Sequence, residues 1–202
     1  MTRIVLGLGG NALLARDQPA DIAAQRANAQ RAAAAIAPLA DSSEVVITHG
    51  NGPQIGSLDI LQSGLPSDRR YPLDVLGAET EGLIGYLLEV ELRNQLPHRK
   101  LATILTMVEI DPADPAFKTP EKPIGPVYAV PDWGRLAQEH GWQGICAAGG
   151  MRRVVPSPRP RRILQTGIIQ DLLKAQCITI CAGGGGVPVQ RRRGAGSRVW
   201  KP

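Results

Sequence analysis

Short apolar runs alternate along the chain with longer segments of helical periodicity. Strands are expected at Arg3–Gly9, Val45–Thr48, Ala102–Met107 and Ile178–Ala182, and helices at Ala20–Ala37, Pro53–Gln62, Val75–Asn94 and Ile163–Lys174. Regular alternation of strands with helices is typical of a parallel sheet that is covered by helices. The pattern therefore predicts an α/β fold built on a parallel sheet.

One long segment departs from this alternation. Residues 108–135 contain six prolines, at positions 112, 115, 120, 123, 126 and 131. Proline lacks a backbone N–H and clashes with the preceding helical turn, so we expect no regular helix across this segment. Long ordered excursions from a compact domain often form lids or binding loops. Arg152–Pro160 is a second proline-broken segment, and it is basic.

Two glycine–asparagine loops follow directly after predicted strands. They are Gly9, Gly10 and Asn11 after the first strand, and Gly50, Asn51 and Gly52 after the second. Glycines between a strand and a helix expose backbone N–H groups, and the positive end of the helix dipole adds to their attraction for anions. Because the carboxyl ends of parallel strands meet at one edge of a sheet, we expect both loops to face one phosphate or carboxylate site.

A third glycine turn and one lysine agree with this interpretation. Gly183–Gly186 again follows a predicted strand, and Lys122 lies between Pro120 and Pro123. The prolines restrict the backbone of Lys122, so its ammonium group is presented rigidly enough to close over an anionic substrate. A single glycine loop is equally compatible with an ordinary turn, because glycine and asparagine accept positive φ values. Three such turns together favour an anion site.

The sequence matches other known phosphate-binding and catalytic motifs less well. Residues 7–12 match Gly-x-Gly-x-x-Ala, but a dinucleotide-binding fold also needs an acidic residue after the second strand. Thr48, His49 and Gly50 stand there instead. No Gly-x-x-x-x-Gly-Lys-Ser/Thr loop occurs in the sequence. We expect His49 to fix its loop through a hydrogen bond rather than to act as a base.

The composition of the chain excludes several classes of protein. The chain has 202 residues, 43% of them hydrophobic, which is enough for the core of one domain. Its three cysteines, Cys146, Cys177 and Cys181, are an odd number without neighbouring histidine pairs. We therefore expect neither a disulfide framework nor a metal site. No signal peptide or membrane span is visible, so we expect a cytoplasmic protein with no membrane partner.

The positive charge of the chain is concentrated at its C-terminal end. The formal net charge is +5, and residues 190–202 alone carry five basic residues and no acidic one. The rest of the chain is neutral. Aromatic residues make up only 3% of the sequence, so a nucleic-acid-binding face is disfavoured.

Eight motifs, in order, resemble carbamate kinase of the amino acid kinase family. They are Gly9–Leu13, His49–Gln54, Pro72–Val75, Gly82–Tyr86, Asp111–Phe117, Lys122–Pro126, Arg152–Pro158 and Gly183–Val189. Each motif alone is modest, but the ordered set covers residues 1–189 almost without a gap. Residues 78–81 are more acidic than is usual in this family, which we interpret as a lineage difference on a helix.

This resemblance implies a fold, a reaction and a set of site residues. The fold is a three-layer αβα sandwich around a mainly parallel sheet, with a protruding proline-rich subdomain at about residues 108–160. The reaction is reversible phosphoryl transfer from ATP to carbamate, giving ADP and carbamoyl phosphate in arginine metabolism, with Mg²⁺ and in a homodimer. Lys122 is implied as the catalytic lysine. The implied substrate-binding residues are Gly9, Gly10, Asn11, Gly50, Asn51 and Gly52, and Gly183, Gly184 and Gly185 are implied for the nucleotide.

The resemblance stops at residue 189. Carbamate kinases continue into a second lobe, in which an Asp-Lys-Asp segment and a further lysine hold the nucleotide. We therefore expect a truncated chain with little turnover and an unrelated, disordered basic tail over residues 190–202. The codons implied by Trp200, Lys201 and Pro202 permit Val-Glu-Ala in another reading frame, as precedes that segment in the family. This suggests a frameshift near Val189.

Two other functions stay open at this point. The first is a truncated remnant that binds an anion or dimerises without turnover. The second is a nucleic-acid-associated protein that uses Arg191–Arg193 of the tail. Sister kinases that act on glutamate, aspartate or acetylglutamate share the fold, but the Lys122–Pro126 motif disfavours them.

Overall fold

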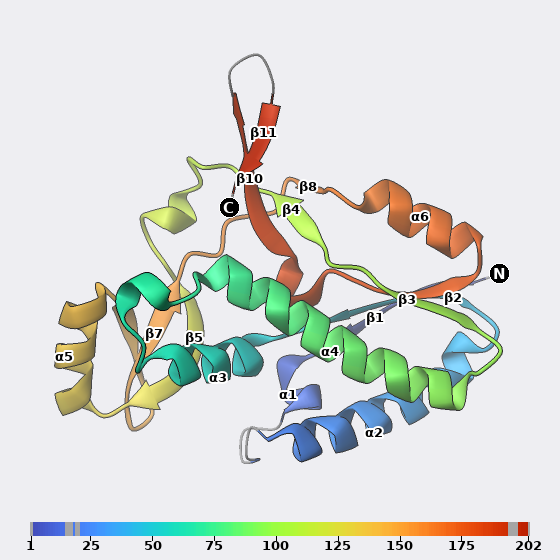
Figure 1. The fold of residues 1–202 in the computed structure, drawn as a ribbon, viewed down its shortest axis with the longest axis horizontal. Coiled ribbons are helices and arrows are strands. Elements are labelled where there is room, and N and C mark those ends of the chain that lie inside the picture. The colour runs from blue at the N-terminus through green and yellow to red at the C-terminus, as the bar shows by residue number, and fades with distance from the viewer. Residues whose placement is uncertain (1, 15–17, 19–20, 194–197, 202) are drawn as a thin grey trace.

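A four-stranded parallel sheet forms the centre of the molecule (Figure 1). The computed structural model describes residues 2–14, 18, 21–193 and 198–201, and for Asn11, Ser67, 192–193 and 198–201 it describes the backbone alone. In spatial order the strands of the central sheet are β1 (Arg3–Leu8), β2 (Glu44–His49), β9 (Cys177–Ile180) and β3 (Lys100–Thr103). The predicted parallel α/β fold is confirmed.

Helices pack on both faces of this sheet (Figure 1). One face carries α2 (Ile22–Ala40) and α4 (Leu73–Gln95), and α6 (Thr166–Lys174) lies on the other. The main core is formed by apolar side chains of α2, α4 and the strands, among them Ala33, Ile47, Leu88 and Ile180. The central strand β9 is buried along its whole length, as is usual for an inner strand of a parallel sheet. The three-layer sandwich is therefore confirmed.

Two further helices begin at the glycine–asparagine loops. They are α1 (Gly10–Leu13) after β1 and α3 (Gly52–Gln62) after β2. Both lie at the carboxyl-end edge of the central sheet because β1 and β2 pair in parallel, with Leu8 opposite His49. No helix in the described part of the chain is both long and apolar enough to cross a membrane.

A small antiparallel sheet forms an arm beside the sandwich, at the left in Figure 1. Its strands are β5 (Lys122–Tyr128), β7 (Gly150–Val155) and β6 (Gln143–Ala147), and α5 (Val130–His140) connects β5 to β6. The helix α5 begins within the segment for which the prolines predicted no regular helix. Pro131 lies in its first turn, where proline is tolerated because that N–H has no helical partner. Pro123 and Pro126 lie on β5, an edge strand that can accept prolines.

A second sheet explains two other differences from the predicted elements. It contains β8 (Arg162–Ile163), β4 (Met107–Glu109), β10 (Val187–Arg193) and β11 (Arg198–Lys201). The predicted strand Ala102–Met107 is therefore divided between β3 in the central sheet and β4 in this one.

Strands also replace part of the irregular tail that the sequence predicted. Gln190–Arg193 pairs in antiparallel register with Arg198–Lys201. Val187–Val189, directly before, pairs with β4, so the hairpin prolongs a strand that the second sheet has already aligned. Val199 and Trp200 are residue types that favour strands.

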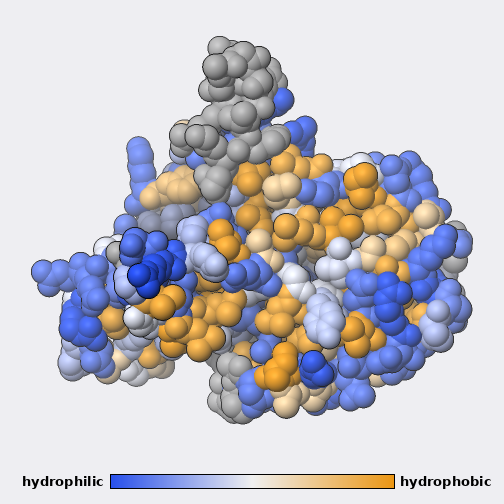
Figure 2. Space-filling view, viewed as in Figure 1, coloured by the Kyte–Doolittle hydropathy of each residue, from blue (hydrophilic) through white to orange (hydrophobic). Residues whose placement is uncertain are grey.

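Large apolar side chains remain on the surface of the sandwich. On the face that Figure 2 shows, they lie over α4, β3 and α6. Tyr86 and Val90 on α4, Leu105 after β3 and Ile168 on α6 are all exposed.

Candidate anion-binding site

The three glycine turns converge at the carboxyl-end edge of the central sheet. The Gly50 N–H donates a hydrogen bond to the Leu8 carbonyl, with an N···O distance of 2.8 Å. A Cβ atom added to Gly50 would lie 2.7 Å from the Gly10 nitrogen, and one added to Gly184 would lie 2.3 Å from the Asn51 Oδ1. Such approaches leave no room for a side chain at either position. The three turns, predicted from separate strands, therefore contact one another.

A hollow of about 470 Å³ lies among these turns. It is lined by Gly7, Leu8, Gly9, Thr48, His49, Gly50, Asn51, Gly52, Lys122, Gly184 and Gly185. None of these lining residues is acidic. The first N–H groups of a helix have no partner within it, so the start of α3 adds backbone donors to the wall. The hollow therefore suits an anion.

Most of the predicted site residues line this hollow, but Gly10 and Gly183 do not. Gly10 contributes backbone beside Gly50, whereas the side chain of Asn11 lies outside the described part of the structure. Gly183 is buried behind the hollow, where a Cβ atom would lie 2.5 Å from the His49 ring. Gly184 and Gly185 line the hollow itself.

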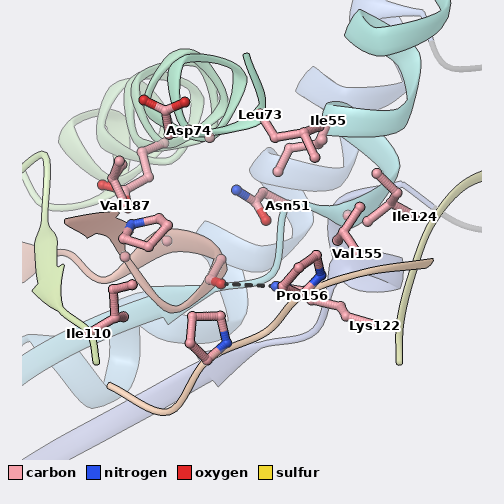
Figure 3. Close-up of a pocket in the computed structure, with 18 of the residues that line it drawn as sticks. Asn51, Ile55, Leu73, Asp74, Ile110, Lys122, Ile124, Val155, Pro156 and Val187 are labelled. Carbon is pink, nitrogen blue, oxygen red and sulfur yellow. Dashed lines mark hydrogen bonds between the residues drawn. The ribbon is translucent and has the colours of Figure 1, made fainter. Parts of the chain in front are cut away.

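Lys122 reaches the hollow from the arm. It is the first residue of β5, where it pairs with Val155 of β7. Its Nζ atom lies 3.5 Å from the carbonyl oxygen of Gly184, the contact that Figure 3 marks with a dashed line. The side chain remains exposed, so its ammonium group is accessible to a ligand.

A second hollow, of about 330 Å³, adjoins the first (Figure 3). The two share Asn51, Gly52, Lys122 and Gly184. The walls of the second hollow are mostly apolar and include Ile55, Leu73, Ile110, Ile124, Val155 and Pro156. Lys122 thus stands where a glycine-lined compartment meets an apolar one.

Backbone geometry at the third turn depends on a threonine that the sequence did not single out. Ala182, Gly184, Gly185 and Gly186 all have positive φ angles. The Thr106 Oγ1 accepts a hydrogen bond of 2.8 Å from the Ala182 N–H, and the Thr48 Oγ1 donates one of 2.9 Å to the Ala182 carbonyl. These two bonds fix an alanine in a conformation that non-glycine residues rarely adopt.

Glu81, on α4, supports the third glycine turn through Thr106. The residue is only 3% exposed, and its Oε2 accepts a 2.8 Å hydrogen bond from the Thr106 N–H. Its Oε1 has no hydrogen-bond partner among the described residues. Burial raises the pKa of Glu81 to about 7, against the opposing effect of the Thr106 hydrogen bond. Glu81 lies three residues before Ile84, on the buried stripe of α4, so helical periodicity was the signal that could have identified it.

The side chains of Asn51 and His49, two of the lining residues, are held by contacts within the protein. The Asn51 amide nitrogen donates to the Thr80 Oγ1 at 2.9 Å, and its side chain is buried. The His49 Nδ1 lies 3.3 Å from the Gly50 carbonyl oxygen. Burial lowers the pKa of His49, and the contact with Gly50 acts in the opposite direction. The ring is therefore neutral at pH 7, in keeping with the loop-fixing role predicted for it.

No three His, Cys, Asp or Glu side chains of the described residues converge on a position that could hold a metal ion. Two of the cysteines are buried in the sheet region. Burial raises the pKa of Cys181 to about 11, and the nearby Glu81 adds to this effect. The Cys181 thiol is consequently a packing group rather than a nucleophile.

Comparison with known proteins gives concordant matches. The family model described as the amino acid kinase family matches residues 2–198. The carbamate kinase of Rhizobium meliloti is 52% identical over 95% of this chain and 60% of its own length. The carbamate kinase of Escherichia coli K12 is 46% identical over 98% of this chain and 67% of its own length.

A carbamate kinase is also among the solved structures that match the chain. The carbamate kinase from Giardia lamblia bound to citric acid superposes with a TM-score of 0.86 at 35% identity. The match covers 95% of this chain and 64% of that one. The chain thus spans about 60% of the length of the first curated relatives that it matches. The family match extends past residue 189, and the domain boundary and frameshift stay predictions.

Proposed function

The chain belongs to the amino acid kinase family, with carbamate kinases as its relatives, and we propose that it forms the carbamate- and phosphoryl-binding part of such an enzyme. The proposed reaction transfers a phosphoryl group reversibly between ATP and carbamate. The observation that supports this most directly is the convergence of three glycine turns and Lys122 around one hollow without an acidic lining residue.

The chemistry of the reaction matches these parts. A carbamate oxygen attacks the γ-phosphorus of ATP, a new P–O bond forms, and the bond to the β-phosphate oxygen breaks as ADP leaves. Carbamate is already an anion, so this step needs no base. Phosphoryl transfer depends mainly on positioning and on stabilisation of negative charge. Backbone N–H groups and an ammonium group provide both.

Each predicted residue has a proposed place in this scheme. The backbone of Gly9, Gly10, Asn11, Gly50, Asn51 and Gly52 would surround carbamate and the transferred phosphoryl group. For Asn51 the backbone is the better candidate, because its side-chain amide already donates to Thr80. Lys122 would neutralise charge on the transferred group from the arm side. Gly184 and Gly185 would face the nucleotide phosphates, with Gly183 as their support.

The nucleotide and the metal ion are implied by the family. A solved relative, the carbamate kinase from Giardia lamblia, is bound to AMP-PNP, which supports ATP and ADP as co-substrates here. Mg²⁺ is also implied, but the described residues form no cluster of metal-binding side chains. This part of the chain does not by itself fit a protein-held ion, and we assign no step to one. A homodimer, a cytoplasmic location and a role in arginine metabolism are the remaining parts of the proposal.

Calorimetric titration of the chain with carbamoyl phosphate tests the proposal. We expect saturable binding at one site, which inorganic phosphate weakens by competition. Absence of binding would contradict the proposed function. A luminescence assay for ATP formed from ADP and carbamoyl phosphate then separates turnover from binding alone. Binding without ATP formation would favour the non-catalytic anion-binding protein.

A further inference from the structure

A largely buried ion pair joins the arm to the central domain. The Arg153 Nη1, on β7 of the arm, lies 2.6 Å from the Asp59 Oδ2, on α3. The two side chains are only 17% and 18% exposed. The pair within α5, Arg135 with Glu139, is 68% and 51% exposed. Neither Asp59 nor Arg153 lines the glycine hollow.

The Arg153 guanidinium is oriented from the arm side by aromatic rings. Its central carbon lies 4.5 Å from the centroid of the Trp142 ring, a cation–π geometry that holds a planar guanidinium in place. Trp142 packs in turn against Tyr128 and Trp133. Burial raises the pKa of Tyr128, and the neighbouring Asp59 carboxylate adds to this effect. Asp59 is therefore part of one packed cluster with Arg153 and the aromatic side chains of the arm.

The backbone of α3 also contacts the arm at Gly56, about one helical turn before Asp59. A Cβ atom added to Gly56 would lie 2.7 Å from the Gly125 Cα, on β5. Gly125 has a φ angle of 67° and accepts a 2.9 Å hydrogen bond from the Arg152 Nε. The helix and the strand thus approach each other through two glycines, at a point three residues after Lys122.

These two contacts lie on the same side of Lys122 in the arm sheet, because β5 and β7 are antiparallel and Arg153 falls between the partners of Pro123 and Val127. Lys122 pairs with Val155, and Arg153 is two residues before Val155 on the same strand. Movement of β7 away from α3 would therefore carry Lys122 with it. We propose that Asp59 and Arg153 are positioning residues, which hold Lys122 over the glycine-lined hollow by fixing the arm to α3. The inference rests on the proposed function only in so far as Lys122 binds the anion.

A hydrogen bond between described residues also connects the arm to the segment after α3, so loss of the ion pair loosens the arm without releasing it. The Arg70 Nη1, in the segment between α3 and α4, lies 3.2 Å from the His140 Nδ1 at the end of α5. Removal of one partner of a buried pair leaves the other charge uncompensated. The variant Asp59→Asn leaves the Arg153 charge without its partner at almost unchanged volume.

Distance measurements between spin labels test the position of the arm. Cys146 on β6 is exposed, whereas Cys177 and Cys181 are buried, so a label attaches selectively to the arm. A second label at Gln30→Cys, an exposed position on α2, reports the central domain. We expect one narrow distance distribution for the parent protein. Asp59→Asn and Gly56→Ala are both expected to shift and broaden it, whereas Glu139→Gln, which breaks an ion pair within the arm, leaves it unchanged.

Phosphate affinity shows whether arm position matters to Lys122. We expect Asp59→Asn to raise the dissociation constant of inorganic phosphate about tenfold or more and Glu139→Gln to leave it unchanged. Asp59→Glu, which keeps the charge, is expected to recover most of the affinity. Unchanged distances in both Asp59→Asn and Gly56→Ala would overturn the inference, as would a displaced arm with parental phosphate affinity. If the parent protein does not bind phosphate, the proposed function fails while the distances still test the ion pair.

Discussion

The ammonium nitrogen of Lys122 lies 3.5 Å from the carbonyl oxygen of Gly184, 62 positions later in the chain. The contact joins the arm to the turn after β9 and places a positive charge among backbone N–H groups. A carbonyl oxygen is a weaker partner for an ammonium group than an anion is. An incoming phosphate is therefore expected to displace this contact.

Replacement of Lys122 by methionine removes that charge while it keeps most of the side-chain volume. A hydrogen bond to a charged group contributes roughly 1.5–3 kcal/mol. We therefore expect the dissociation constant of carbamoyl phosphate, measured by calorimetry, to rise roughly tenfold to 100-fold. Lys118→Met removes an exposed lysine from the same excursion and is expected to have no such effect. Equal affinities of the two variants would exclude Lys122 from the site.

Gly50→Ala tests the contact between the first two turns. The added Cβ would lie 2.7 Å from the Gly10 nitrogen, so one loop must move. Overpacking of this kind typically costs about 1–3 kcal/mol, and we expect a loss of that size in the free energy of unfolding by urea. Gly82→Ala, on α4, meets nothing within 4 Å and should stabilise the helix by up to about 1 kcal/mol. A neutral Gly50→Ala would show that the two turns are farther apart than described.

Glu81 predicts a pH dependence of stability with a defined sign. Burial raises its pKa from the ordinary value of 4.5 to about 7, so between these values the folded state holds a proton that the unfolded chain has released. The contribution is fully present below about pH 4.5 and is lost as pH rises through about 7. We expect a loss of about 3 kcal/mol across this window.

Glu81→Gln isolates this contribution from other titrating groups. His49, whose pKa is lowered by burial, destabilises the fold at the acidic side of its own range, and this effect is common to both proteins. The difference in the free energy of unfolding between parent and variant should therefore change with pH only through Glu81. Parallel stability profiles from pH 4 to 8 would contradict a buried, protonated carboxyl at this position.

Thr106→Val tests the support of the third turn. The variant removes the oxygen that accepts the Ala182 N–H and leaves a partly buried donor without that partner. Such a loss typically costs about 1–3 kcal/mol, and we expect faster amide hydrogen exchange at Gly183–Gly186. Thr106→Ser keeps the hydroxyl group and is the matched control. Similar rates of amide hydrogen exchange in the two variants would show that the Thr106 hydroxyl does not support the third turn.

The convergence of the first two glycine loops could be predicted from the sequence, whereas the order of the strands around them could not. The meeting of the loops after β1 and β2 follows from a general property of parallel sheets and needed no coordinates. The position of β9 between β2 and β3 could not be predicted, because strand order is decided by tertiary packing. The third turn joins the site only through that order.

Two local features were missed in the predictions from the sequence, each for a physical reason. Prolines were interpreted as excluding helix from residues 108–135, but Pro131 lies in the first turn of α5, where its missing N–H has no cost. The acidic residues 78–81 were interpreted only as a lineage difference on a helix, so the buried position of Glu81 was not predicted. Its burial depends on Thr106, which is remote in sequence and donates the hydrogen bond that makes burial possible.

Backbone amide resonances of the chain during titration with carbamoyl phosphate test the central claim most directly. The account predicts that the amides of Gly10, Gly52, Gly184 and Gly185 shift together with a single dissociation constant, and that Lys122→Met weakens all of them in parallel. Shifts confined to one turn, or separate dissociation constants for the three turns, would contradict a common anion site.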